Sequence, residues 1–231
     1  MRDIFLSDVH LRLDHPDRGA RLAGLVDRLG PDDSLTIVGD LCDFWYAARQ
    51  RSADPMSCSG LRSLAGFRDR GGAITVLAGN HDAWLGPFYE RTLGARFEAD
   101  SIDFLRQGAR VHVVHGHRQG ARTAWKAGLE SRAFLEAFRR LPGPLADHLG
   151  AQLQRTNARH QDAFDRRGLE VFRRFAATLA GTYDLVILGH VHRPLDTGPT
   201  RPRLIVLGGW QAQTCYLTID GTSITHVVEP A

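Results

Sequence analysis

Short apolar runs rich in β-branched residues recur along the chain, separated by longer stretches whose apolar positions have helical spacing. Five of these runs stand out, and none alternates cleanly between apolar and polar residues. Runs of this kind are typical of strands buried on both faces of a sheet. The five expected strands are 4–6, 35–38, 74–77, 111–114 and 185–188.

Helical spacing between these runs predicts a layered α/β fold. One expected helix carries Leu22, Leu25, Val26 and Leu29, and another carries Leu61, Leu64 and Arg68. The tail adds a sixth strand at 203–207 and a hairpin at 217–224 that turns on Asp220-Gly221. A mixed sheet, or two sheets facing each other, would accommodate these later strands.

Residues 118–181 show no strand pattern. Apolar residues recur there every three or four positions, which predicts amphipathic helices broken at Pro142-Gly143-Pro144. Because this segment lies between the fourth and fifth strands, we interpret it as a helical cap inserted into a single domain that spans 1–231.

Composition is that of a soluble globular protein and excludes a disordered chain. The 231 residues are 43% hydrophobic and 24% charged. No run approaches the length of a membrane span, and the first residues do not resemble a secretory signal. Three cysteines are too few for a disulfide framework, so we expect a reducing cytoplasmic location.

Charge is divided unevenly along the chain, although the net charge is only +3. The segment 118–181 holds twelve basic and six acidic residues, a net charge of +6, which leaves −3 for the rest. A basic insertion suits phosphate groups or an anionic membrane surface. We do not expect nucleic-acid binding, because the sheet region is negative and aromatic residues do not interleave with the arginines.

A polar cluster follows each of the five expected strands directly. The clusters are Asp8-Val9-His10, Gly39-Asp40, Gly79-Asn80-His81-Asp82, His115-Gly116-His117 and Gly189-His190-Val191-His192. In open α/β sheets ligands bind at the carboxyl ends of strands, where neighbouring loops converge. We therefore expect these carboxylate, imidazole and amide groups to meet at one edge.

Two aspartates, several imidazoles and an asparagine are too many ligands for one tetrahedral zinc ion. They suit two divalent ions that share a carboxylate. Mixed nitrogen and oxygen ligands without thiolate favour manganese, iron or zinc. Paired metals about 3.5–4 Å apart are a common device for activating water against phosphorus.

In this order, the five motifs resemble those of the calcineurin-like metallophosphoesterases over residues 8–192. The resemblance implies a four-layer α/β/β/α sandwich and two divalent ions, with manganese favoured over iron or zinc. It implies a first metal held by Asp8, His10, Asp40 and His192, and a second held by Asp40, Asn80, His115 and His190. His81 would contact phosphate and protonate a leaving group, and Asp82 would orient the imidazole of His81.

Within this superfamily, the chain is similar to the UDP-2,3-diacylglucosamine hydrolases. The shared features are the aromatic pair after Asp43, Trp84, the helical insertion and the segment 207–210. Phe44 replaces the arginine of the protein phosphatases, which argues against that branch. The resemblance implies hydrolysis of a nucleotide-sugar lipid to UMP and 2,3-diacylglucosamine 1-phosphate in lipid A biosynthesis. Two positions differ from its best-known branch, which has arginine at His81 and aspartate at His117.

In that family the insertion holds the acyl chains, and its basic residues meet phosphate and the membrane. The candidate substrate-binding residues are Arg122, Trp125, Phe134, Phe138, Arg155 and Asn157, and Leu135, Leu145 and Leu149 are further candidates for the acyl groove. We accordingly expect peripheral contact with the inner membrane from the cytoplasmic side. Two other functions stay open: a phosphodiesterase or phosphatase for soluble nucleotides or other phosphoesters, and a non-enzymatic scaffold on this fold. The oligomeric state also stays open.

Overall fold

Eleven strands form two sheets in the part of the chain that the computed structural model describes. That part comprises residues 1–13, 15–43, 54–119, 134, 137 and 140–231, with side chains at 145, 148, 149 and 164–178 of the long helix 143–178. The six-stranded sheet has the order β11-β10-β1-β2-β3-β4. Its strands are β1 (Arg2–Leu6), β2 (Ser34–Val38), β3 (Ala73–Leu77), β4 (Arg96–Glu98), β10 (Gln213–Asp220) and β11 (Ser223–Pro230).

The second sheet is five-stranded, with the order β5-β6-β7-β9-β8. Its strands are β5 (Ser101–Arg106), β6 (Ala109–Val114), β7 (Leu185–Leu188), β8 (Leu195–Asp196) and β9 (Arg203–Val206). The described helices are α1 (Pro16–Val26), a 3₁₀ turn η1 (Pro55–Ser57), α3 (Ser59–Asp69), α4 (Gly86–Leu93) and α7 (Gly143–Thr178).

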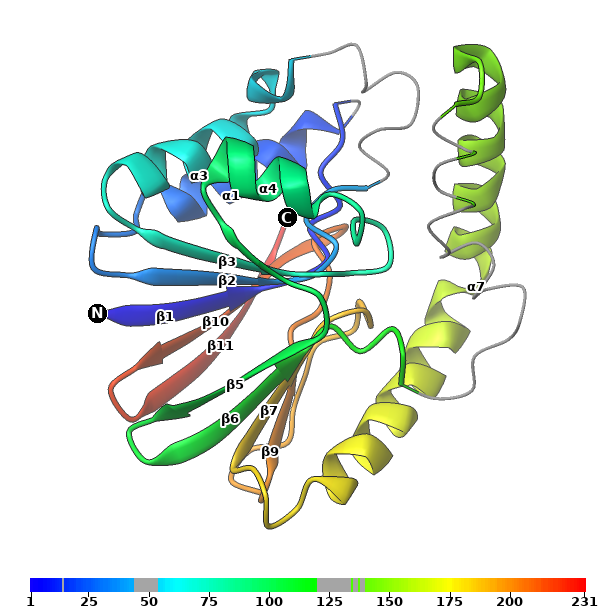
Figure 1. Cartoon of the computed structure of the whole chain (residues 1–231). Helices are drawn as coiled ribbons and strands as arrows, with labels where there is room; N and C mark the ends of the chain where they lie inside the picture. Colours follow the sequence, from blue (N-terminus) through cyan, green and yellow to red (C-terminus); the bar gives the residue numbers. More distant parts are fainter. Residues whose placement is uncertain (14, 44–53, 120–133, 135–136, 138–139) are drawn as a thin grey trace.

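Three apolar clusters hold the sheets and helices together as four layers. One lies between the first sheet and helices α1, α3 and α4, a second lies between the two sheets, and a third lies between the second sheet and α7. Strand β1 shows how the pattern works, because Ile4 and Leu6 face the helices while Phe5 faces the other sheet. The α/β/β/α sandwich expected from the sequence is therefore confirmed (Figure 1).

Parallel pairing brings the functional loops to one edge. In the first sheet, β1, β2 and β3 run parallel, with Leu6 opposite Ile37 and Val38 opposite Leu77. In the second sheet, β6 and β7 run parallel, with Val114 opposite Leu188. The loops that follow these five strands consequently leave the sandwich on the same side.

All five predicted strands and the Asp220-Gly221 hairpin are confirmed. Strands β4 and β5 and helix α4 were not anticipated. Strands β4 and β5 lie at the edges of the two sheets and contain no fully buried residue, so they lack the continuous apolar pattern of the central strands.

Helix α7 begins after Pro142, at the predicted break, and continues for 36 residues. Its C-terminal part packs Leu169, Phe172 and Ala176 on the second sheet and so forms the outer layer of the sandwich. Its N-terminal part extends past the edge of the sheets, where Leu145 and Leu149 are exposed (Figure 1). The insertion boundaries at about 118 and 181 stay a prediction. No described helix has the length and apolar character needed to cross a membrane.

Candidate dinuclear metal centre

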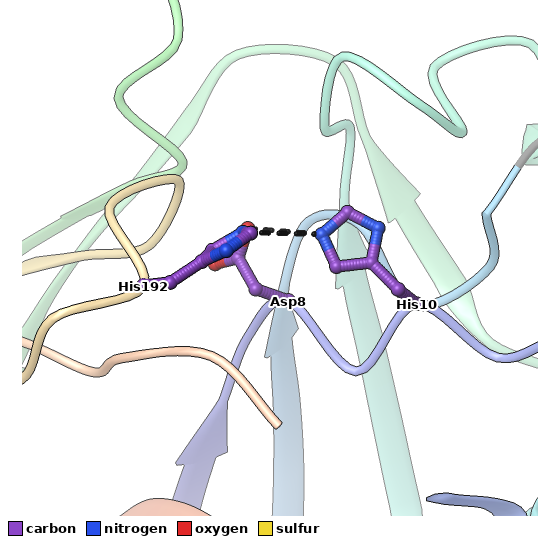
Figure 2. Close-up of side chains that lie close together, drawn as sticks. All are labelled: Asp8, His10 and His192. Carbon is purple, nitrogen blue, oxygen red and sulfur yellow. Dashed lines mark hydrogen bonds and ion pairs between the residues drawn. The ribbon is translucent and has the colours of Figure 1, made fainter. Parts of the chain in front are cut away.

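The first cluster of possible metal ligands joins the loop after β1 to the loop after β7. The Nε2 atoms of His10 and His192 lie 3.3 Å apart, and each faces Oδ1 of Asp8, at 3.7 and 3.6 Å. Figure 2 shows the two imidazoles pointing toward each other beside the carboxylate. Ligands held about 2.1 Å from one ion are separated by roughly 3–3.5 Å, so these three atoms have the spacing of a metal site.

A second cluster, which contains Asp40, lies next to the first and approaches it at His10. Oδ2 of Asp40 lies 3.5 Å from Nε2 of His115 and 3.9 Å from Nε2 of His10. His190 completes a group with Asp40 and His115 in which one ligand atom from each residue lies within 4.8 Å of the others. Oδ1 of Asn80 is 3.2 Å from Nε2 of His115. The seven residues predicted as ligands are thus brought together, with Asp40 between the two groups.

Backbone strain is concentrated at these positions. Five described non-glycine residues have positive φ, and four of them are Asp8, His10, Asp40 and His190, with φ of 54°, 50°, 53° and 64°. This left-handed conformation is unfavourable for residues with a Cβ atom and persists where surrounding structure enforces it. The close approach of two loops adds a further constraint, because a Cβ atom on Gly79 would lie 2.0 Å from Oδ1 of Asp40.

Hydrogen bonds fix how these side chains present their ligand atoms. Oδ2 of Asp8 accepts hydrogen bonds from the Ser7 hydroxyl and, at 2.7 Å, from the backbone N–H of His190. Nδ1 of His115 contacts the carbonyl oxygen of Val38 at 2.7 Å, which makes Nδ1 the donor and leaves Nε2 as the ligand nitrogen. Supports of this kind orient metal-binding residues before the metal arrives.

The electrostatic environment keeps both carboxylates ionised. Burial alone would raise the pKa of Asp8, but His10 and His192 outweigh it and hold the pKa well below its usual range. For Asp40, burial is likewise outweighed by His115 and His81, so its pKa is lowered. Burial together with the nearby charge of His115 lowers the pKa of His190, which favours a neutral imidazole able to bind a metal.

The residues present fit divalent metal ions. Oδ1 of Asp8 is fully buried and has no hydrogen-bond donor among the described residues, although a buried carboxylate oxygen normally has one. It faces two imidazole nitrogens, so a cation would satisfy all three atoms. Cysteine is absent from the described clusters, and the three thiols are buried elsewhere. A donor set of carboxylate, imidazole and amide oxygen matches two hard or borderline divalent ions.

His81 lies beside the metal ligands and is bound by Asp43. Its Nδ1 is 2.8 Å from Oδ1 of Asp43, and its ring packs edge-to-face on His10, with centroids 4.7 Å apart. Nη1 of Arg12 contacts the other oxygen of Asp43 at 3.3 Å. Burial alone would lower the pKa of His81, but Asp40 and Asp43 outweigh it and raise the pKa to about 9. Both carboxylates therefore favour the protonated form of the imidazole.

The expectation that Asp82 orients His81 is wrong, because Asp43 occupies that position. The buried carboxylate of Asp82 accepts hydrogen bonds from the backbone N–H groups of Asp40, Leu41 and Gly79 and from the Tyr89 hydroxyl. It therefore fixes the loop that carries Asp40 and lies behind the reactive edge. Asp43 was missed in the sequence, where its spacing of three residues from Asp40 was the available signal.

Most of the substrate-binding residues predicted in the insertion have side chains outside the described part of the structure. Arg122, Trp125 and Phe138 lie outside the described residues. Arg155 and Asn157 lie within α7, but their side chains are outside the described part. Phe134 is a half-buried helical residue. These assignments stay predictions.

Adjacent groups of possible metal ligands, at the loop edge of an α/β/β/α sandwich, indicate a metallophosphoesterase. A family model supports this class independently: calcineurin-like phosphoesterase matches residues 1–194. The chain belongs to this family and is a metal-dependent hydrolase.

Two curated relatives are similar to this chain along nearly its whole length. The chain is 30% identical over 238 residues to a UDP-2,3-diacylglucosamine hydrolase of Aeromonas salmonicida, covering 94% of this chain and 89% of that protein. It is 30% identical over 234 residues to the hydrolase of the same name from Pseudomonas aeruginosa, covering 95% of each. Among solved structures, an archaeal phosphodiesterase aligns over 99% of both chains with a TM-score of 0.49 and 15% identity.

Proposed function

We propose that this protein hydrolyses the pyrophosphate bond of UDP-2,3-diacylglucosamine, giving UMP and 2,3-diacylglucosamine 1-phosphate for lipid A biosynthesis. The observation that carries this proposal is the 30% identity to curated hydrolases of that name along nearly the whole chain. The geometry supports it, because three overlapping groups of candidate metal ligands, one of which includes His81, meet at the loop edge of the sandwich.

The proposed reaction transfers the uridylyl group to water. The oxygen of water bonds to the α-phosphorus, and the bond from this phosphorus to the bridging oxygen breaks. Water's oxygen stays with UMP, and the bridging oxygen leaves with the sugar 1-phosphate. Two divalent ions bound by the seven ligand residues would supply Lewis-acid activation of water and neutralise charge on the phosphates.

The leaving oxygen develops negative charge as the bond breaks, and His81 is the described group suited to neutralise it. Asp43 holds Nδ1, so we assign the transferable proton to Nε2 on the other side of the ring. Asp40 contributes twice, since its Oδ1 accepts the backbone N–H of His81 at 2.8 Å while Oδ2 faces His10 and His115. The acid group and the metal ligands are thereby held in a fixed relation.

The insertion supplies the properties that a diacylated nucleotide sugar requires. It carries a net charge of +6 for the diphosphate and the membrane surface. The leucine side chains at 145 and 149 of α7 are 47% and 36% exposed, although most of the described leucines are buried. Exposed apolar groups on a basic helix suit an acyl chain that leaves a bilayer.

Manganese is the metal we propose for both positions, with iron or zinc as alternatives, because the ligands are imidazole and oxygen groups without thiolate. We further propose a cytoplasmic protein that contacts the inner membrane peripherally through the basic insertion. Sedimentation with vesicles containing anionic lipid, at low and at high salt, tests this contact. Equal binding to neutral and to anionic vesicles, with no dependence on salt, would contradict this contact.

Incubation of the Mn²⁺-loaded protein with UDP-2,3-diacylglucosamine tests the activity, with UMP and inorganic phosphate measured separately. We expect UMP without inorganic phosphate, and no UMP from an Asp8→Asn variant prepared in parallel. Hydrolysis of soluble phosphodiesters without release of UMP would overturn the lipid assignment and support the alternative of a soluble substrate.

A further inference from the structure

Three consecutive residues of the loop after β7 rest on one turn of α7. The aromatic ring of Phe164 packs edge-to-face on His190, with centroids 5.4 Å apart. Oδ1 of Asp165 accepts the backbone N–H of His192 at 3.3 Å. A Cβ atom on Gly168 would lie 2.5 Å from Cγ2 of Val191. Both histidines are candidate metal ligands, and Val191 between them is fully buried.

Asp165 is an unusual residue for this position. It is only 6% exposed, and buried carboxylates are uncommon unless they are hydrogen-bonded or paired with a cation. Its carboxylate approaches the backbone of His192 from α7, whereas the imidazole of His192 faces Asp8 and His10.

The backbone of His192 is held from two directions. Asp165 accepts its N–H, and its carbonyl oxygen accepts the backbone N–H of Gly209 at 3.1 Å. Between them, these contacts set where the peptide lies and therefore where Nε2 of the imidazole is placed. The backbone N–H of His192 therefore depends on one carboxylate, that of Asp165, which belongs to a different element, α7.

Close packing at Gly168 makes the contact rigid. The helix can approach the loop only because residue 168 has no side chain, so Val191 fits against the helix backbone. The same turn therefore fixes the loop by apolar contact at Val191, by ring packing at His190 and by a charge-assisted hydrogen bond at His192.

We propose that Asp165 is a positioning residue for the metal centre: through the backbone of His192 it sets the affinity of the first metal position. Contacts behind a metal ligand typically change affinity by about 10–100-fold when they are removed. The proposal rests on the metal centre and is independent of the substrate, so metal binding tests it without any turnover.

The test titrates Mn²⁺ into metal-depleted protein and measures the affinity and number of bound ions, without substrate. We expect Asp165→Ala to lower the affinity for one of the two Mn²⁺ ions by about 10–100-fold and to leave the affinity for the other nearly unchanged. Asp165→Asn keeps an acceptor oxygen but loses the charge, so its loss should be smaller. Glu170→Gln is the matched control, because this exposed carboxylate on the same helix pairs with Arg174.

Thermal unfolding of the metal-free variants separates positioning from folding. A positioning role predicts weaker Mn²⁺ binding by variants whose metal-free protein unfolds near the wild-type temperature, with turnover recovering at high Mn²⁺. Gly168→Ala provides a second route if Asp165→Ala does not fold, and we expect it to weaken Mn²⁺ binding by displacing Val191. Folded Asp165→Ala that binds both ions within twofold of wild type would overturn the proposal, as would equal weakening in Glu170→Gln.

Discussion

The loop edge of the sandwich and the inserted helix α7 differ in what determines their structure. At the loop edge, every candidate ligand follows a central parallel strand, and its backbone is held by neighbouring loops. In the N-terminal part of α7, the described leucines 145 and 149 are exposed and face no described core. The edge is therefore fixed by the sheets, whereas the two described leucines at the start of α7 have no described core to hold them.

This difference indicates that the loop edge determines the reaction, whereas the exposed part of α7 determines which substrate is bound. A centre built from strand ends tolerates little change, because the strained backbone and close loop contacts leave one arrangement. A helix with unpaired apolar side chains can be adapted to a different ligand without disturbing the sheets. Substitutions at the edge should therefore reduce turnover of every substrate, whereas substitutions on the exposed part of α7 should affect only lipid substrates.

The largest expected effect is at Asp40, whose carboxylate faces a candidate ligand in each cluster, His10 and His115. Asp40→Asn removes the charge that would bridge two ions, and loss of several kcal/mol of transition-state stabilisation lowers kcat/KM by on the order of a thousandfold. Release of UMP from the diacylated substrate and hydrolysis of bis(p-nitrophenyl) phosphate should fall together. Asp196→Asn, at a surface pair with Arg203, is the control and should retain activity. A large loss confined to one substrate would contradict the separation of edge and insertion.

Removal of the partner of His81 should produce the next largest effect. Asp43 helps to raise the pKa of His81 to about 9, so the protonated form is present below that pH and is lost as the pH rises through it. Asp43→Asn should shift the alkaline limb of the kcat profile to lower pH and reduce kcat, because general acids contribute about 10²–10⁴-fold. His81→Gln should abolish this limb. An unchanged limb in both variants, measured at saturating Mn²⁺, would exclude His81 as the acid.

Metal binding should stabilise the edge and the fold together. An ion that binds only the folded state adds about 2.7 kcal/mol to the free energy of unfolding at one hundred times its Kd. The unfolding temperature of the wild-type protein should therefore be clearly higher with Mn²⁺ than with EDTA. The difference should shrink in Asp8→Asn, which loses the buried oxygen between His10 and His192. Equal stabilisation of this variant would argue against Asp8 as a ligand.

The smallest effect is expected on the exposed part of α7. Burying a leucine side chain contributes about 1.5–3 kcal/mol, so partial burial by an acyl chain is equivalent to roughly a fivefold change in affinity. Leu145→Glu or Leu149→Glu should raise KM for the diacylated substrate by about that factor and leave hydrolysis of bis(p-nitrophenyl) phosphate unchanged. Leu105→Glu is the control, because this leucine is 71% exposed but lies on β5. An equal rise in KM for all three variants would remove the case for an acyl site.

Sequence reasoning succeeded where a residue's position along a strand decides its position in space. Asp8, Asp40 and His115 follow buried parallel strands, and parallel strands bring their carboxyl ends to one edge, so their proximity could be predicted. Sequence reasoning failed where the direction of a side chain decides which residue it contacts. Asp82 adjoins His81 in sequence, but its carboxylate points back to the loop of Asp40, while Asp43 reaches the imidazole from another loop.

The two parts of α7 show a second limit. Leu145 and Phe172 both belong to apolar stripes with helical spacing, yet Leu145 is nearly half exposed and Phe172 is buried on the second sheet. Spacing shows that a helix has an apolar face but not which element covers that face. Only the course of α7 relative to the sheets distinguishes the two stretches.

Strand β1 carries the loop of Asp8 and His10, and one of its two neighbours is β10, which lies near the other end of the sequence. The backbone N–H of Trp210 also binds the carbonyl oxygen of Asp8. A ribosome adding about 5–20 residues per second needs roughly 10–40 s to make the intervening chain. During that interval one edge of β1 is unpaired and open to association with other strands. The pairing that closes this edge of β1, beside the loop of Asp8 and His10, therefore forms only after residues 213–220 have been made.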